Sequence, residues 1–214
     1  MMQNVLLLGD SIRLFYQDKV KEKLGSDYKV MSPEENCRFS YYALNSLRFW
    51  LPKFETPDII HWNIGLWDSA ILYPEDGCFV SKNEYVENMK KILRELKKTG
   101  AKVIFATTTP VKDEKKFLPG PMPPRHQNED IIEYNAAVLE AFKDENIDIN
   151  DLHTLFYPKR EEYLSDDMIH PNEDGVELLS EAVVNAIKKH SGFINNKTKK
   201  EVIADIEKSE KTIQ

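Results

Sequence analysis

Long hydrophobic runs are missing from this sequence. A membrane span takes roughly 18 or more mainly apolar residues, and no stretch approaches that length. The apolar run near the start is short, stops at Gly9-Asp10 and is not preceded by basic residues, so it does not fit a secretory signal peptide. We therefore expect a cytoplasmic protein without a membrane span, although a secreted protein that has lost its signal peptide would show the same sequence.

Cysteine is scarce, and positive charge is outnumbered. The 2 cysteines, Cys37 and Cys78, have no metal-type spacing, so free thiols are expected. His61, His126 and His153 have no partner spacing that points to a metal either. The formal net charge of −7 argues against a general nucleic-acid-binding protein, which normally carries a basic face. We expect no metal, no cofactor and no nucleic-acid partner.

What is present fits one α/β domain. The chain has 214 residues, of which 41% are hydrophobic, enough to fill a single sizeable core. Short apolar runs alternate with amphipathic segments, which is typical of βαβ units and a parallel sheet. The expected strands cover residues 5–8, 28–31, 58–62, 103–107 and 147–149.

Capping residues mark where the expected helices begin. Two helices cover residues 11–23 and 40–50, and a capping box at Ser81 opens a third that ends at Gly100. Asn128 is expected to cap the fourth and Asn172 the fifth, after a loop over residues 112–127. We expect the domain to cover residues 1–192. The charged tail over 193–214 is expected to form an added helix on the domain, a helix for a partner, or no fixed structure.

Two short motifs carry the chemistry. Gly9-Asp10-Ser11 follows the first expected strand, and Asp167-Met168-Ile169-His170 precedes the last helix. Serine, histidine and aspartate are the nucleophile, base and orienting carboxylate of serine hydrolases. Each motif alone also fits an ordinary helix cap or loop. Asp166 is an alternative carboxylate.

Together, the two motifs resemble those of the SGNH hydrolases, also called GDSL esterases or lipases. The resemblance covers roughly residues 5–190 and implies a three-layer α/β/α sandwich with about five parallel strands, the flavodoxin-like SGNH hydrolase fold. It implies that Ser11 is the nucleophile, that His170 is the general base and then the general acid, and that Asp167 orients His170. It also implies ester hydrolysis through an acyl-serine intermediate without a cofactor or metal.

The family's other blocks are altered in this chain. The backbone N–H of Ser11 is one expected oxyanion donor. The usual Asn-x-Gly-x-Ser block falls on residues 36–40, where Arg38 replaces glycine and its N–H is the second expected donor. The usual Gly-x-Asn-Asp block falls on residues 65–68 and places Trp67 at the asparagine position. We favour the Asn63 side chain as the third donor, with the Trp67 indole N–H as the alternative.

The substrate is expected to be a small acyl ester, most simply an acetyl ester of a carbohydrate. Trp62 and Trp67 stand beside the expected site, where indoles suit a sugar ring or an acyl chain, and the chain has no apolar lid segment. The alternatives are a lipid or general carboxylesterase, an acyltransferase, a non-catalytic carbohydrate-binding module with the same fold, and an interaction protein that acts through its tail. The expected substrate-binding residues are Asp10, Asn36, Gly65, Trp67 and Thr109.

Overall fold

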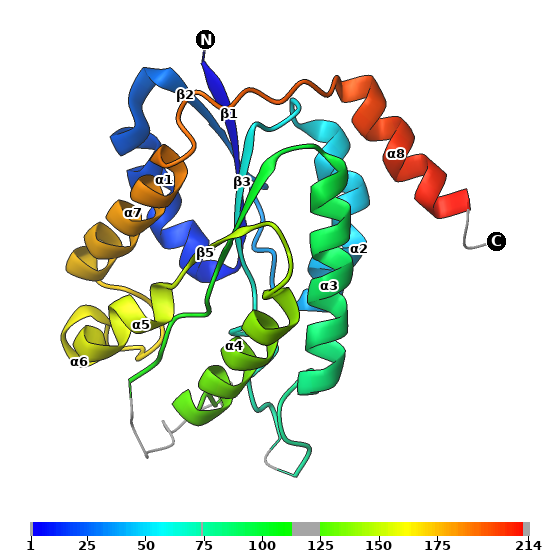
Figure 1. The fold of residues 1–214 in the computed structure, drawn as a ribbon. Helices are drawn as coiled ribbons and strands as arrows, with labels where there is room; N and C mark the ends of the chain where they lie inside the picture. Colours follow the sequence, from blue (N-terminus) through cyan, green and yellow to red (C-terminus); the bar gives the residue numbers. More distant parts are fainter. Residues whose placement is uncertain (1, 74, 113–124, 212–214) are drawn as a thin grey trace.

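A parallel β-sheet forms the centre of the molecule (Figure 1). The computed structural model describes residues 2–73, 75–112 and 125–211. Within these residues the sheet has five strands in the order β2-β1-β3-β4-β5, all parallel. The three-layer α/β/α fold is confirmed, and the sheet changes winding direction between β1 and β3. The strands are β1 (Gln3–Gly9), β2 (Tyr28–Met31), β3 (Ile59–Asn63), β4 (Lys102–Ala106) and β5 (Asp148–Asn150).

Helices cover both faces of this sheet. On one face lie α1, α5 and α7, and on the other lie α2, α3 and α4, as Figure 1 shows. Alternate residues of β1 feed the two resulting cores: Leu6 and Leu8 pack toward α2 and α3, while Val5 and Leu7 pack toward α1 and α7. The helices are α1 (Ser11–Leu24), α2 (Ser40–Trp50), α3 (Lys82–Lys98), α4 (Asn128–Phe142), α5 (Leu152–Phe156), α6 (Arg160–Tyr163), α7 (Glu173–Lys188) and α8 (Lys199–Lys211).

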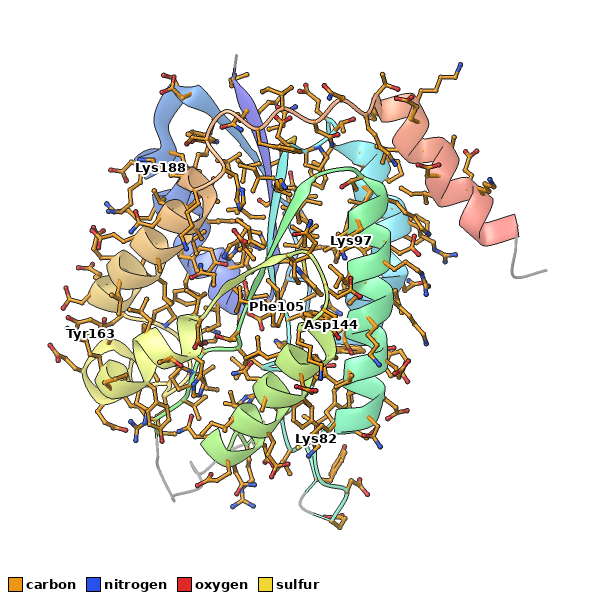
Figure 2. The ribbon with its side chains drawn as sticks, in the orientation of Figure 1. Lys82, Lys97, Phe105, Asp144, Tyr163 and Lys188 are labelled. Atoms are coloured by element: carbon orange, nitrogen blue, oxygen red, sulfur yellow. The ribbon has the colours of Figure 1, made fainter. Side chains whose placement is uncertain are left out.

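The alternation of side chains along each strand also decides which face of the sheet each aromatic residue lies on. Trp62 on β3 and Phe105 on β4 are fully buried, and their rings lie 5.2 Å apart. Figure 2 shows Phe105 inside the molecule, while Lys82 and Lys188 lie on the outside. Trp62 was expected beside the site. That expectation is wrong, because its position on β3 directs the indole into the core under α3 and α4.

Side-chain caps begin several helices at the expected residues. Asp10 accepts a hydrogen bond from the Ile12 N–H, and Asn172 accepts one from the Gly175 N–H. Asn128 was also expected to be a cap, but it is the first residue of α4. Its side chain instead bonds the N–H and the carbonyl of Val111, which ties the end of the β4 segment to α4. Most of the expected loop over residues 112–127 lies outside the described residues.

The C-terminal segment adds a helix to the α2–α3 side of the domain. Val202 and Ile206 of α8 are buried in the same core cluster as Leu47 and Trp50 of α2. Before α8, the Asn195 side chain donates to two backbone carbonyls, which holds the segment across the end of the sheet. Among the described residues, no helix combines the length and apolar character that a membrane crossing requires.

Candidate active site

The carboxyl end of β1 presents a serine at the start of a helix. β1 ends at Gly9, Asp10 caps α1, and Ser11 is the first residue of that helix. N–H groups in the first turn of a helix have no intrahelical partner and favour negative charge. Ser11 therefore stands where a developing oxyanion finds backbone donors. β1 lies next to β3 at the change in winding direction, where ligands bind in sheets of this type.

The structure brings three residues predicted from the sequence into one hydrogen-bonded chain. The Ser11 Oγ lies 2.8 Å from the Nε2 of His170, and the Nδ1 of His170 lies 2.6 Å from the Oδ2 of Asp167. Such distances allow the histidine to exchange a proton with the serine while the carboxylate holds the other side of the ring. The histidine side chain is 24% exposed, so the pair is open to a substrate from outside.

The two oxygens of Asp167 have different partners. While Oδ2 faces the histidine ring, Oδ1 accepts hydrogen bonds from the backbone N–H groups of Ile169 and His170 and from the Ser165 hydroxyl. Partial burial by itself raises the pKa of Asp167. The backbone N–H groups, the imidazole and the hydroxyl outweigh it and hold the pKa well below its usual range. Asp167 is therefore a carboxylate at neutral pH.

A strained backbone position shapes this turn. Met168, between the carboxylate and the histidine, has a φ of +69°, a left-handed conformation that a side chain rarely adopts. Its carbonyl accepts a hydrogen bond from the Lys112 N–H, and its N–H donates to the Ser165 carbonyl. These bonds and those to Asp167 over-determine the turn, so the strain persists. The turn lets a carboxylate reach a ring three residues later.

One aromatic side chain packs on the His170 ring, and a second histidine is affected by its charge. The Phe15 ring stacks on it with centroids 4.7 Å apart and an interplanar angle of 17°. His126 lies just before α4. Its pKa is lowered to about 4, mainly because the ring is buried and to a smaller extent because of the charge on His170. Sequence reasoning did not bring either residue to the site, because no spacing rule links positions so far apart.

Behind Ser11 lies a buried polar network. Asp10 is 1% exposed, and burial raises its pKa to about 6, against the lowering effects of the Ile12 N–H and of the His170 and Arg13 charges. The Asn63 amide nitrogen lies 3.5 Å from the Asp10 Oδ1, and the Asn63 oxygen accepts from the Tyr16 hydroxyl at 2.9 Å. The structure thus places Asn63 behind Asp10, with both polar ends occupied.

Glycine at position 9 is required by this packing. A Cβ built on Gly9 would lie 2.5 Å from the Asn63 Oδ1 and 2.6 Å from the Arg13 Cβ. Both distances are far below van der Waals contact, so any side chain here would displace Asn63 or α1. The glycine of the Gly-Asp-Ser motif therefore sets how closely α1 crosses the end of β3.

Arg13 is a structural residue of the site that sequence reasoning missed. It is fully buried, and its guanidinium donates to the carbonyls of Pro33, Glu35 and Gly9 at 2.9, 2.6 and 3.4 Å. These bonds fasten the segment before position 38 to α1. The available signal was an arginine on the helix face shared with Tyr16, where a buried charge demands acceptors.

The backbone of Arg38 adopts the left-handed conformation that is expected of the glycine it replaces in the block over residues 36–40. Its φ is +53°, and its N–H donates to the Asn36 Oδ1 at 2.7 Å. Its side chain is exposed and its guanidinium lies 4.7 Å from the centre of the Tyr42 ring. Arg38 thus keeps the left-handed turn typical of glycine, with its N–H held by Asn36.

The side chain of Asp68 joins the block over residues 65–68 to the block over residues 36–40. Both oxygens of this buried carboxylate lie 3.0 Å from the Ser40 N–H at the start of α2, and burial raises its pKa to about 7. Gly65 is required here, since its Cβ would lie 2.3 Å from the Thr108 Oγ1 and 2.6 Å from the Tyr85 hydroxyl. Trp67, between them, is 37% exposed.

The expected substrate-binding residues divide into two groups. Asn36 is partly exposed and Trp67 is exposed at the protein surface. Asp10, Gly65 and Thr109 are buried, with Asp10 and Thr109 only 1% and 2% exposed. They lie behind the surface because the segments after β1, β3 and β4 turn inward to pack under the helices. Among the described residues, no group of three or more histidine, cysteine or acidic side chains is arranged to hold a metal ion.

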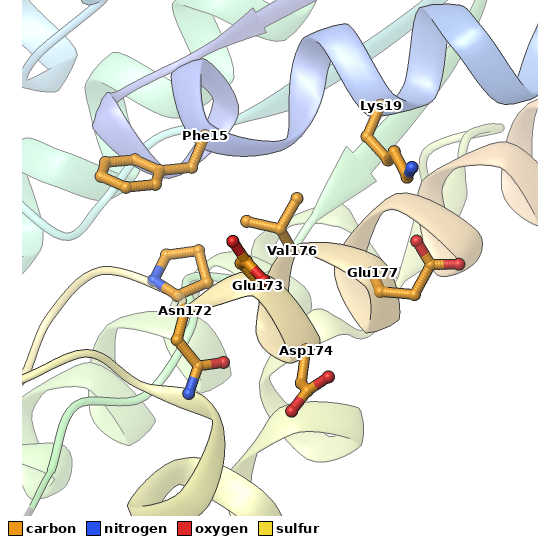
Figure 3. Close-up of a pocket in the computed structure, with 8 residues that line it drawn as sticks. Phe15, Lys19, Asn172, Glu173, Asp174, Val176 and Glu177 are labelled. Carbon is orange, nitrogen blue, oxygen red and sulfur yellow. The ribbon is translucent and has the colours of Figure 1, made fainter.

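A hollow of about 660 Å³ opens between α1 and the start of α7, and Ser11, His170 and Asp167 are not among its lining residues (Figure 3). Phe15, which stacks on His170, forms one end of it, and Pro171 continues directly from the histidine. The rest of the lining is mostly charged or polar. The lining residues are Phe15, Lys19, Pro171, Asn172, Glu173, Asp174, Val176 and Glu177.

Residues 8–178 match the model of the GDSL-like Lipase/Acylhydrolase family. No curated protein sequence matches the chain significantly. The fold is similar to that of a lipase/acylhydrolase from Enterococcus faecalis, with 20% identity, a TM-score of 0.72, and 92% of this chain and 100% of that chain covered.

Two other similar structures carry more specific names. One is an acetyl xylan esterase, with 18% identity, a TM-score of 0.65 and coverage of 86% and 99% of the two chains. The other is a variant of an acetyl-xylooligosaccharide esterase from Geobacillus, with 18% identity, a TM-score of 0.68 and coverage of 86% and 94%. At these identities the likeness is one of fold.

Proposed function

The chain belongs to the GDSL-like Lipase/Acylhydrolase family, a family of carboxylic ester hydrolases, and from this premise we propose that it is a serine esterase for small acyl esters, most simply acetyl esters of a carbohydrate. The observation that carries the proposal is the continuous chain of hydrogen bonds from the Ser11 Oγ through His170 to Asp167. Such a chain activates a hydroxyl for attack on a carbonyl.

In the proposed acylation step, Ser11 Oγ attacks the ester carbonyl as the Nε2 of His170 takes its proton. Asp167, ionised at neutral pH, stabilises the imidazolium that forms. The tetrahedral intermediate then collapses, the bond from the carbonyl carbon to the alcohol oxygen breaks, and His170 returns the proton to the leaving alcohol. The acyl group remains on Ser11.

In the proposed deacylation step, His170 takes a proton from water, and the hydroxide formed attacks the acyl-serine carbonyl. Collapse releases the carboxylic acid, and the proton returns to Ser11. In both steps negative charge develops on the carbonyl oxygen, and donors aimed at that charge are usually the largest electrostatic contribution to rate.

We assign the oxyanion donors to the N–H groups of Ser11 and Arg38 and to the side chain of Asn63, with the Trp67 indole as the alternative third donor. In the free protein the Arg38 N–H is bonded to Asn36 and the Asn63 amide faces Asp10. Each must exchange that partner for the oxyanion. Trp67 is partly exposed, and among the described residues its indole N–H has no hydrogen bond to exchange.

The preference for a short acyl group on a sugar has two supports. The hollow between α1 and α7 offers both hydrogen-bonding groups (three carboxylates, a lysine and an asparagine) and apolar surface (Phe15, Pro171 and Val176), a combination that suits a sugar ring. Two proteins of similar fold are named as esterases of acetylated xylan or acetylated xylooligosaccharides.

The test compares p-nitrophenyl acetate with p-nitrophenyl octanoate, for the wild type and for Ser11→Ala. Acetate turnover that disappears in Ser11→Ala, together with fluorophosphonate labelling of Ser11, is the expected result. Faster octanoate turnover would favour a lipid esterase, and transfer of acetyl to added alcohols in preference to water would favour an acyltransferase. If neither ester reacts and Ser11 is not labelled, the non-catalytic binding module replaces this proposal.

A further inference from the structure

We propose that Phe15 is a positioning residue for the general base: its ring holds the imidazole of His170 in place while the acyl group is on Ser11. This inference rests on the proposed esterase function and concerns the second half of that reaction. The ring centroids of Phe15 and His170 lie 4.7 Å apart, and the two ring planes are inclined by 17°. Aromatic rings stacked at this separation stabilise one another beyond the effect of the area that they bury.

The helix α1 carries both the nucleophile and the ring that packs on its base. Ser11 and Phe15 are four residues apart in α1, so they project from the same face of the helix. Other residues of α1 fill the core: Ile12 and Tyr16 are buried, whereas Phe15 is 47% exposed. The packing of α1 on the sheet therefore does not depend on the Phe15 ring, and a smaller apolar side chain at this position should leave the protein folded.

The backbone of His170 is fixed by its turn, but the direction of its ring depends on side-chain contacts. The His170 N–H donates to the Asp167 Oδ1, and the His170 carbonyl accepts from the Ser165 N–H. The ring is hydrogen-bonded through Nδ1 to Asp167 and through Nε2 to Ser11. Within the described part of the chain, Phe15 is the one aromatic ring that packs on the face of the imidazole.

One of these contacts is lost in every catalytic cycle. Once the acyl group is on Ser11, the Oγ is an ester oxygen and has no proton to donate to Nε2. Nε2 must then accept a proton from the attacking water, so the ring has to keep its direction without the serine. The bond to Asp167 and the contact with Phe15 remain, and the Phe15 contact uses neither ring nitrogen. Phe15 therefore matters more for deacylation than for acylation, in which the Ser11 hydrogen bond also orients the ring.

The experiment measures the two half-reactions separately with p-nitrophenyl acetate. The value of kcat/KM reports the steps up to acylation. Intact-protein mass spectrometry at saturating ester gives the fraction of enzyme that carries an acetyl group, and kcat divided by that fraction is the deacylation rate constant. Phe15→Leu keeps an apolar side chain but loses the ring. We expect its deacylation rate constant to fall about five- to tenfold, while kcat/KM stays within about twofold of the wild type.

Three further variants show whether the aromatic ring itself is responsible. Phe15→Met, a second non-aromatic variant, should behave as Phe15→Leu. Phe15→Tyr keeps a ring that can stack and should restore the deacylation rate constant to within about twofold of the wild type. Phe49→Leu is the matched control: Phe49 is a phenylalanine of α2 that is 54% exposed, and this variant should behave as the wild type. Far-UV circular dichroism of each variant checks that it is folded.

The results distinguish a failure of the positioning role from a failure of the proposed esterase. The positioning role is overturned if the deacylation rate constants of Phe15→Leu and Phe15→Met stay within about twofold of the wild type. It is also overturned if kcat/KM falls as much as the deacylation rate constant, or if Phe15→Tyr is as slow as Phe15→Leu. If the wild type does not hydrolyse p-nitrophenyl acetate, or if Ser11→Ala still does, the proposed esterase itself fails, and the positioning role fails with it.

Discussion

Replacing Asp167 with asparagine tests the proposed catalytic chain most directly, because the two carboxylate oxygens have separate roles, one in holding the turn and the other in orienting His170. Oδ1 holds the turn through the Ile169 and His170 N–H groups, and Oδ2 faces the Nδ1 of His170 at 2.6 Å. An asparagine oxygen can still accept the backbone bonds. Its NH₂ group then faces Nδ1 and forces the ring into the tautomer that carries its proton on Nε2, toward Ser11.

The expected effect is large for activity and small for stability. A histidine with its proton on Nε2 cannot accept the Ser11 proton, and the same change in other serine hydrolases lowers kcat by about 10⁴, which corresponds to about 5 kcal/mol. The Asp167 side chain is 50% exposed, so the loss of its charge should change the free energy of unfolding by about 1 kcal/mol or less.

The assay is kcat for p-nitrophenyl acetate, with the rate of fluorophosphonate labelling of Ser11 and a urea denaturation curve for each variant. Asp166→Asn is the matched control, because Asp166 is the neighbouring exposed carboxylate and should leave kcat within about twofold. The reasoning is refuted if Asp167→Asn keeps more than a tenth of the wild-type kcat. It is also refuted if Asp166→Asn loses as much activity as Asp167→Asn.

Three further predictions concern the surroundings of Ser11. Asp10→Asn should remove a pH dependence, because burial raises the folded-state pKa of Asp10 from 3.8 to about 6. As pH rises from 4 to 7, the wild type should lose about 2 kcal/mol of stability relative to the variant, measured by urea denaturation at both pH values. Arg13→Met leaves three backbone carbonyls without their donor and should lower the free energy of unfolding by about 2–4 kcal/mol; an unchanged urea midpoint would contradict this. If Trp67 is the third oxyanion donor, Trp67→Phe should lower kcat about 10²-fold with KM nearly unchanged, whereas a kcat within about twofold would leave that role to Asn63.

The order of the five strands and of the five longer helices α1, α2, α3, α4 and α7 could be predicted from the sequence, because it depends on local patterns, whereas the short helices α5 and α6 were not predicted. The run 5–8 is apolar because β1 is covered on both faces, and Asn172 caps α7 because it bonds an N–H three residues away. Failures occurred where a distant partner decided the outcome. Asn128 has the residue type of a helix cap, but its side chain is hydrogen-bonded to the backbone of Val111, which is 17 residues away.

The candidate site shows the same division. Asp167 and His170 are three residues apart, so their pairing depends on one tight turn and could be proposed from the chain alone. The partners of Asn63 and Arg13 could not be proposed. They are set by how α1 crosses the end of β3, and the Tyr16 hydroxyl that meets Asn63 lies 47 residues away in the sequence.

By itself, then, the sequence determined the fold class, the family and the three residues proposed for catalysis, since each of these is recorded in short-range patterns of residue type. Only the tertiary structure decided that Trp62 is in the core and Trp67 at the surface, that Asp10 is buried with a raised pKa, and that a hollow opens between α1 and α7 next to Phe15 and Pro171. Burial and electrostatic potential are sums over neighbours from distant parts of the chain, so they take definite values only when the helices have packed on the sheet.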